Sequence, residues 1–304
     1  MRRRIALLAV LIITVGLWGC AQDDGMMSPT STTAPTTESQ TTVTPEFKAE
    51  LEQMIESEEP LNTPMSASFG WNTIDGPAVI TEPGIYAVTD DFAVADDGIV
   101  VQSDHVLLLL GNHCLTGPGN KEGRGIVLDG VKHVLVWGGQ LKTLGLGVAV
   151  LNSEHCAVKG VSIEGGDEFA DPGAGIAPQI GIMLINSPRN WIARNQMDLV
   201  NLGIFVRGSG SYKNHVFRNR VTGGDMGLLA ICYNPAPGGG PDDGPSHDKI
   251  RFNHLERFPT GIQANTGVTN NYFTHNVIKY FVSPYEDLNG SNIFRHNRKM
   301  QITP

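Results

Sequence analysis

Two arginines at matching positions are the residues best suited to hold an anionic ligand. Arg194 and Arg218 each precede the asparagine of an apolar-x-x-Asn motif that recurs along the chain. If these motifs stack coil upon coil, the two guanidinium groups lie one strand spacing apart and repel each other. An anionic ligand such as a uronate chain would offset the repulsion, and so would nearby carboxylates such as Asp198 or Glu256. The pattern therefore allows two interpretations: an acidic-glycan site, or an ordinary charged face with local ion pairs.

Further side chains are candidates for the same glycan site, if the outward apolar row and the arginine row share one groove. The residues expected to contact substrate are Met183, Phe205, Arg220 and His275. If the protein cleaves its ligand, the expected catalytic residues are Arg194, Arg207, Arg218 and His254.

An apolar row is predicted to point away from the core near these candidates. It comprises Met183, Ile185, Phe205, Leu229 and Ile231. Exposed apolar rows need a cover, which would come from long loops of the chain itself, from a partner or from a ligand.

Two long insertions carry most of the clustered carboxylates. Residues 165–179 contain Asp167, Glu168 and Asp171, and residues 233–247 contain Asp242 and Asp243. Clustered carboxylates and loop carbonyls suit calcium, so Asp242 and Asp243 are a candidate calcium site. The alternative is that both insertions are solvated acidic loops, because no EF-hand or nonapeptide calcium pattern is present.

A repeat of about 22 residues must position these groups, because it runs from about residue 98 to the end of the chain. Its apolar residues alternate with period 2, which predicts strands, and no helical stretch of ten residues or more separates them. Three short strands and three turns per repeat make one coil of a parallel β-helix. The Gly-apolar pairs that mark the repeat are Gly125-Ile126, Gly147-Val148, Gly181-Ile182, Gly203-Ile204, Gly227-Leu228 and Gly261-Ile262.

The register of the repeat assigns the core and the turns. The inward pairs are predicted to be Ile126 and Leu128, Val148 and Val150, Ile182 and Leu184, Ile204 and Val206, Leu228 and Ala230, and Ile262 and Ala264. Two rows of turn residues are predicted to form hydrogen-bonded ladders. The first row is Asn195, Asn219, Asn253, Asn276 and Asn297, and the second is Asn190, Asn214, Asp248, Asn271 and Asn292.

With these Gly-Ile and Asn repeats, and with the segment Ile80-Thr81-Glu82-Pro83-Gly84-Ile85-Tyr86, the chain resembles the right-handed parallel β-helix proteins of the pectate-lyase-like superfamily. The resemblance covers about residues 72–302. It implies an all-β, single-stranded parallel β-helix of about nine coils, whose members include polysaccharide lyases, glycosidases, adhesins and periplasmic accessory proteins. Fold alone does not choose among these functions.

The catalytic motifs of that superfamily are not matched. Its lyases use Arg or Lys as base with calcium on the uronate, and its glycosidases use paired carboxylates. We find no Arg-x-Pro-x-x-Arg and no close Asp-Asp pair with a Gly-His-Gly turn. We therefore expect a polysaccharide-binding protein without catalysis, and keep a lyase or glycosidase and a structural or adhesive protein as alternatives.

The N-terminal residues read as an export signal and a tether. Residues 1–19 have a basic start and a short apolar run, and they end in Leu17-Trp18-Gly19 before Cys20, which resembles the bacterial lipobox. This implies acylation of Cys20 and a lipid-anchored protein of the bacterial outer membrane or cell surface. Residues 20–44 are rich in Ser, Thr and Pro and predict a disordered tether. Residues 45–60 predict a helix that caps the solenoid, or one that only links, and residues 61–304 form the β-helix domain.

Composition limits the partners and cofactors. The net charge of −9 argues against nucleic acid. Cys114, Cys156 and Cys232 show no metal-type spacing, although one disulfide is possible. His105, His133 and His155 precede similar strands and predict a turn ladder, with a metal site as the alternative. The resemblance also reaches periplasmic proteins that mature nitrous-oxide reductase with copper, but no Met/His cluster supports a copper role here. The oligomeric state is left open.

Overall fold

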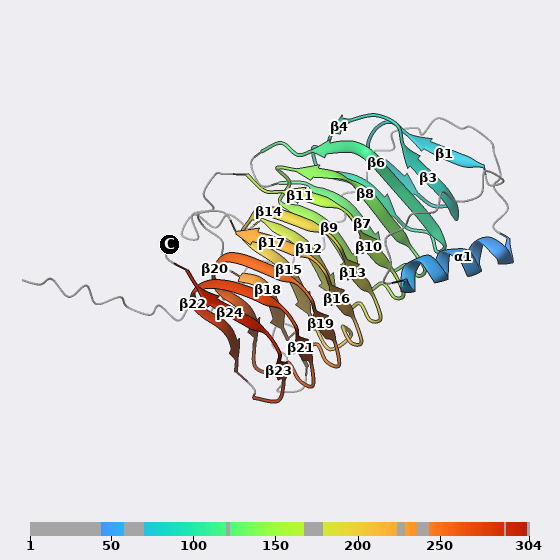
Figure 1. The fold of residues 1–304 in the computed structure, drawn as a ribbon. Helices are drawn as coiled ribbons and strands as arrows, with labels where there is room; N and C mark the ends of the chain where they lie inside the picture. Colours follow the sequence, from blue (N-terminus) through green and yellow to red (C-terminus); the bar gives the residue numbers. More distant parts are fainter. Residues whose placement is uncertain are drawn as a thin grey trace, which may run out of the picture. The chain divides into compact units, whose positions relative to one another are not determined.

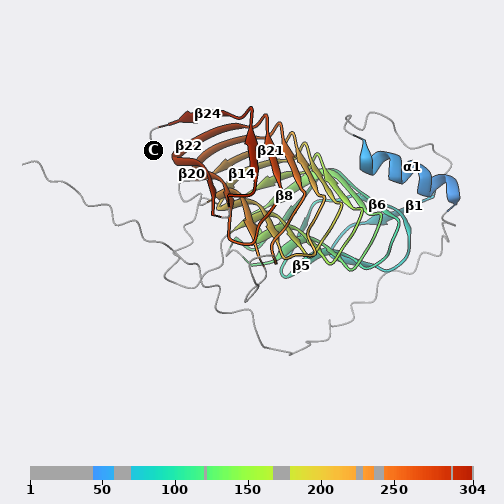
Figure 2. The ribbon, with the colours of Figure 1, turned by 90° about the horizontal axis from the view of Figure 1, so that it is seen from below.

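The computed structural model describes residues 44–57, 70–119, 122–166, 179–223, 229–235, 243–288 and 290–302. Cys20, the predicted signal peptide and tether up to residue 43, residues 167–178 of the first insertion and residues 236–242 of the second, Asp242 among them, lie outside these residues. The described chain forms a right-handed parallel β-helix, in which successive coils stack with every pairing parallel (Figures 1 and 2). No helix in these ranges is long and apolar enough to cross a membrane.

Sheet 1 carries the Gly-Ile repeat. Its inward side chains Ile126, Val148, Ile182 and Ile204 have no exposed surface, which confirms the predicted core in these coils. The stacking of nine strands in this sheet, among the described residues, agrees with the expected number of coils. The strands are β2 (Ala78–Ile80), β5 (Asp97–Val101), β7 (Arg124–Asp129), β9 (Leu146–Leu151), β12 (Ile180–Ile185), β15 (Leu202–Arg207), β18 (Leu229–Asn234) and the ends of β20 (His254–Ala264) and β22 (Val277–Asp287).

Sheet 2 follows sheet 1 in each coil, and the N-terminal helix packs on the outer side of four of its strands. Its strands are β1 (Trp71–Ile74), β3 (Gly84–Val88), the start of β6 (Val106–Thr116), the start of β8 (Leu135–Lys142), β10 (Ala157–Lys159), β13 (Trp191–Ala193), β16 (His215–Phe217), β19 (Lys249–Arg251), β21 (Tyr272–Thr274) and β23 (Ile293–Arg295).

Sheet 3 completes the coil. Its strands are β4 (Phe92–Ala93), the ends of β6 and β8, β11 (Ser162–Glu164), β14 (Gln196–Val200), β17 (Arg220–Gly223), the starts of β20 and β22, and β24 (Arg298–Gln301).

One register prediction was wrong. Ile231 pairs with Ile204 and Ile262 and is fully buried in the core, whereas it was expected to point outward. In this coil, Ala230-Ile231 therefore takes the place of the Gly-apolar pair of the repeat. It lies three residues after the predicted pair, Gly227-Leu228. The core position next to it is filled by Tyr233, whose hydroxyl is buried inside the β-helix.

The helix α1 (Pro45–Glu56) begins where its sequence predicts, but it is shorter than expected. The Thr44 hydroxyl accepts a hydrogen bond from the Phe47 backbone N–H at 3.2 Å, and Pro45 occupies the first turn, as is common at helix N-termini. Its buried face comprises Phe47, Leu51, Met54 and Ile55.

The position of α1 differs from the expected cap over the end of the solenoid. It packs on the outer side of sheet 2 against side chains from four successive coils (Figures 1 and 2). These coils carry apolar residues where a solvent-facing strand would carry polar ones, and burying them stabilises the docked helix. They are Ile85, Leu107, Leu135 and Ala157.

A buried lysine fixes the C-terminal end of α1. The Lys159 ammonium donates to the Met54 carbonyl at 2.5 Å and to the Ser57 carbonyl at 2.8 Å, where the last carbonyls of a helix lack partners. Burial, aided by the charge of Arg194, lowers the pKa of Lys159 to about 8.

Lys159→Met should loosen the helix without unfolding the coils, because it leaves these two carbonyls without their donor. We expect α1 docking to weaken by about 1–2 kcal/mol, close to the value of a charged hydrogen bond. The measurement is amide hydrogen exchange over residues 45–56, with Lys132→Met, an exposed lysine paired with Glu154, as the control. Unchanged exchange in the Lys159 variant would show that the apolar face alone holds α1.

Candidate functional site: the corner between sheets 2 and 3

A line of left-handed residues runs along the solenoid where each sheet 2 strand turns into sheet 3. We call it the corner strip: Gly111, Gly138, Gly160, Arg194, Arg218, Phe252, His275 and His296, all with φ between 55° and 74°. Register and backbone hydrogen bonds place each member directly above the next. Successive members are thus about 4.8 Å apart, the distance between neighbouring strands.

The asparagine ladder holds this corner in place, as predicted. The Asn195 backbone N–H donates to Asn219 Oδ1 at 3.0 Å, and the Asn219 backbone N–H donates to Asn253 Oδ1 at 3.0 Å. Asn276 and Asn297 continue the same pattern. Because each asparagine follows a member of the corner strip, the ladder fixes the spacing of the strip.

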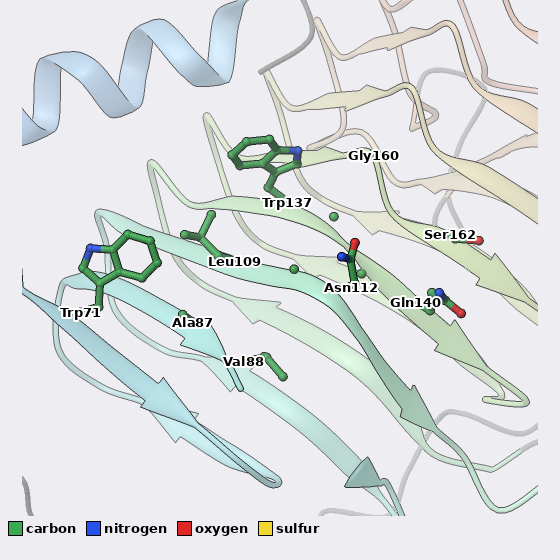
Figure 3. A pocket seen from close by; sticks show the side chains of 12 residues that line it. Trp71, Ala87, Val88, Leu109, Asn112, Trp137, Gln140, Gly160 and Ser162 are labelled. Atoms are coloured by element: carbon green, nitrogen blue, oxygen red, sulfur yellow. The ribbon is translucent and has the colours of Figure 1, made fainter. Parts of the chain in front are cut away.

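The N-terminal part of the strip is a hollow of about 610 Å³ (Figure 3). Trp71 and Trp137 stand on sheet 2, and Asn112, Gln140 and Ser162 lie on the sheet 3 side. Trp71 is 51% exposed. The indoles lie on the first and fourth strands of this sheet, roughly 14 Å apart at the usual strand spacing.

Glycine at the corner creates the space. A Cβ on Gly160 would lie 3.5 Å from Trp137 Cδ1, so the indole packs beside a corner that has no side chain. A Cβ on Gly139 would lie 2.2 Å from Leu110 Cβ, so this turn requires glycine. The floor of the hollow is therefore backbone, which a ligand can approach closely.

The C-terminal part of the strip is basic and aromatic. Register places Gln196, Arg220 and His254 side by side on sheet 3, next to Arg194 and Arg218. Farther along, the His275 ring stacks between Phe252 and His296, with centroid distances of 5.2 and 5.1 Å. Five of the predicted site residues thus share one surface: Arg194, Arg218, Arg220, His254 and His275.

A carboxylate beside this surface is held by two basic groups. Glu256 Oε2 lies 2.9 Å from Lys279 Nζ and 3.0 Å from His254 Nε2. The hydrogen bond from Lys279, with a smaller effect of His254, lowers the pKa of Glu256. An ionised, paired carboxylate is poorly suited to act as a general acid.

Met183, Phe205 and Arg207 are not brought to this surface. All three lie on strands of sheet 1, away from the corner strip. Phe205 is 5% exposed, so it offers almost no area to a ligand, and its neighbour Cys232 is equally buried. The sequence could not show this. Alternation separates side chains that point inward from those that point outward, but it does not show which outward side chains other parts of the chain cover.

Metal sites have little support among the described residues. These hold no group of three His, Cys, Asp or Glu side chains that could bind an ion. Asp243 is exposed, and the calcium assignment for Asp242 and Asp243 stays a prediction, since Asp242 is outside the described ranges.

The histidines form the predicted ladder. The His105, His133 and His155 rings stack at 4.9 and 5.5 Å, nearly parallel. Nitrogens of stacked rings do not converge on one point, as the ligands of an ion must. Glu52 of α1 lies 3.3 Å from His133 Nδ1, which ties the ladder to the helix.

Comparison with known proteins assigns the family. The family model described as "Periplasmic copper-binding protein (NosD)" matches residues 71–300. The chain belongs to the NosD family. A search among curated proteins gives no match.

Two solved structures of a lacto-N-biosidase of family GH136 from Eubacterium ramulus resemble this NosD-family chain in fold. The selenomethionine derivative has 11% identity and a TM-score of 0.48, and the alignment covers 82% of this chain and 54% of that one. The native protein has 12% identity and a TM-score of 0.42, with 71% and 45% covered. The chain thus spans about half the length of these structures.

The described residues do not fit the copper of the family description. Copper prefers imidazole, thiolate and thioether ligands that converge. Burial raises the pKa of both Cys156 and Cys232 to about 12, which keeps them as thiols, and Met197 is buried in the core. All three described cysteines are free. No step of the proposed function below therefore involves copper.

Proposed function

We propose that this NosD-family protein is an exported, lipid-anchored β-helix that binds polysaccharide along the corner strip without cleaving it. The observation that carries the proposal is the strip itself, a row of equivalent corner positions, one per coil, with glycine in the N-terminal coils and Arg, Phe or His in the later ones. A polysaccharide is likewise a linear repeat, so a chain laid along the strip meets equivalent contacts at each coil. Rigid scaffolds with outward polar and aromatic groups are well suited to such binding.

Binding without cleavage agrees with the carboxylates near the strip. Hydrolysis of glycosidic bonds needs two carboxyl groups on either side of the bond, one of them protonated. Among the described residues next to the strip, Glu256 is engaged by Lys279 and His254, and Asp198 accepts a hydrogen bond from Gln196 at 2.5 Å. The register places the two in one row of sheet 3 with Thr222 between them, and each already has a hydrogen-bond partner.

The location of the protein is proposed from its N-terminus and its family. NosD proteins are described as periplasmic, which agrees with export. Acylation at Cys20 would hold the β-helix at the membrane through residues 20–44. Cys20→Ser should move the protein from the membrane fraction to the soluble periplasmic or culture fraction.

Arg218→Ala tests the strip as the binding surface. We expect the affinity for polygalacturonate to fall at least fivefold, because a central cation of the strip is lost. Affinity electrophoresis and calorimetry measure this affinity. The matched control is Arg257→Ala, which removes an exposed arginine at a different turn and should leave binding within twofold.

The same samples separate the alternatives. Formation of reducing ends or unsaturated products from polygalacturonate or neutral polymers would show that the protein is a hydrolase or lyase and would contradict binding without cleavage. An Arg218→Ala variant that binds as the wild type does would remove the strip from the proposal. Absence of binding to every polymer tested would contradict glycan binding altogether and favour a protein partner.

A further inference from the structure

The hollow at the N-terminal end of the corner strip differs chemically from the rest of the strip. Its side chains are the indoles of Trp71 and Trp137, the aliphatic groups of Ala87, Val88 and Leu109, the amides of Asn112 and Gln140, and the Ser162 hydroxyl. The remaining lining residues are glycines. None of the residues that line it carries an ionisable side chain.

No described cation lines the hollow. Arg194 occupies the corner position one coil beyond Gly160, at the edge of the hollow, and other nearby basic groups contact partners elsewhere. Lys159 follows Trp137 by one coil, but its ammonium is buried against the last carbonyls of α1. Lys142 lies 3.2 Å from Glu164, and His113 lies 3.4 Å from Asp91. A sugar carboxylate in the hollow would lose water beside two indoles and find no cation among the residues that line it, which is costly.

We infer that the hollow is a subsite for uncharged pyranose units of the bound glycan. Indole faces pack well against the apolar C–H face of a pyranose, and amides and hydroxyls pair with its hydroxyl groups. Because the two indoles are roughly 14 Å apart along the coil axis, the hollow takes several sugar units in the direction of the strip. This inference rests on the proposed function and specifies its ligand. Uncharged sugar units bind in the hollow, independently of the units that bind at the basic C-terminal part of the strip.

The repeat supplies a variant that closes the hollow. The corner position occupied by Gly160 carries arginine in the next two coils, as Arg194 and Arg218. Gly160 has φ 65° and Arg194 has φ 57°, so arginine is accommodated in this backbone conformation at this corner. Gly160→Arg should thus place a long cationic side chain in the hollow while the coil keeps its shape.

The experiment uses the intact protein with cellohexaose, chitohexaose and maltohexaose as neutral probes and hexagalacturonate as the acidic one. We expect at least one neutral hexasaccharide to bind by calorimetry, with a change in tryptophan fluorescence. Raising NaCl from 50 to 500 mM should change its affinity less than twofold, because no ion pair is involved. Trp71→Ala and Gly160→Arg should each weaken it at least tenfold.

Two controls make the result specific. Gly130→Arg changes a glycine with φ 67° and open space around it, outside the hollow, and should leave the affinity within twofold. Tyr272→Ala removes an aromatic ring, 45% exposed, from the equivalent row near the other end of sheet 2, and should also have no effect on a hexasaccharide in the hollow.

Each failure has a distinct meaning. Binding of hexagalacturonate alone, or neutral binding that Gly160→Arg leaves intact, overturns the inference and leaves the proposed function standing. Loss of binding in the Gly130→Arg control to the same extent as in Gly160→Arg also overturns it. If neither the hexasaccharides nor the polymers bind, both the inference and the proposed function are wrong.

Discussion

Asp248→Asn should stabilise the protein at neutral and alkaline pH, by up to about 5 kcal/mol at pH 8 to 9. Asp248 occupies an asparagine position in the ladder at the corner between sheets 1 and 2, and it is fully buried. Its Oδ1 accepts from the Asn214 backbone N–H at 2.7 Å, as an asparagine would.

The second carboxylate oxygen of Asp248 accepts a long hydrogen bond from the Asn214 side-chain amide, at 3.4 Å, but it stands where an asparagine has a donor, and this is the source of the instability. Elsewhere in this ladder the side-chain amide donates to a carbonyl of the preceding coil, as Asn190 does to Ser153 at 2.9 Å and Asn271 does to Pro245 at 3.1 Å. The equivalent carbonyl for Asp248 belongs to Ser211, three residues before Asn214. An ionised carboxylate cannot donate to it, whereas a protonated one or an asparagine can.

The pH dependence follows from the same environment. Burial raises the pKa of Asp248 to about 8 from an ordinary value near 4, and the hydrogen bonds from Asn214 reduce this rise. Since the folded pKa exceeds the unfolded one, the stability contributed by the proton is complete below pH 4 and is lost as the pH rises through 8. The other titratable group facing Asp248 is Tyr233, whose pKa burial raises well above its usual value, so it stays neutral.

Urea unfolding of wild type and Asp248→Asn at pH 5 and pH 9 tests this prediction. The variant should gain most at pH 9 and little at pH 5. The control Asp243→Asn, at an exposed site five residues earlier, should change neither value. An Asp248→Asn protein that is less stable than the wild type at pH 9 would show that the carboxylate is satisfied when ionised.

Asn219→Ala should have the largest destabilising effect, about 3–5 kcal/mol. Its Oδ1 accepts from the Asn195 backbone N–H and side-chain amide, both at 3.0 Å, and its own amide donates to the Ile192 carbonyl at 2.8 Å. All these groups are buried, and each one left without a partner costs about 1–3 kcal/mol. The corner beside Arg218 should also shift, so polymer binding should weaken together with stability.

The matched control is Asn297→Ala at the C-terminal end of the same ladder. Asn297 is half-buried, so water can replace its hydrogen bonds and the loss should be less than half as large. Equilibrium unfolding in urea gives the comparison. Equal losses in the two variants would mean that burial of the ladder does not set its contribution.

Periodicity was sufficient to predict the coils, because each one repeats the same inward pair and the same turn asparagine. It failed at residues 227–231 for a physical reason. The run Leu228-Leu229-Ala230-Ile231 is apolar throughout, so alternation does not select which residues face inward. The strand pairing of Ile231 with Ile204 and Ile262 shows that Ile231 is the residue that faces inward. This pairing is known only from the stacked structure.

The hollow was not predicted, because its parts do not repeat. Trp71 and Trp137 are single residues on distant strands, and the glycines that make room for a ligand read as ordinary turn glycines. One signal was present: the column that holds arginine at 194 and 218 holds glycine at 138 and 160. Similarly, the apolar outward residues Leu107 and Leu135 could have placed α1 on the side of the solenoid, since the helix offers the only described apolar face to cover them.

The stacking of Ile126 under Val148 has a consequence for how such a protein changes length. Each coil contacts only its neighbours, so excising the 22 residues from one equivalent position to the next leaves the junction in register. The length of the solenoid then changes in steps of one coil. In the proposed binding mode, gain or loss of a coil would lengthen or shorten the bound segment of glycan, while every remaining contact keeps its geometry.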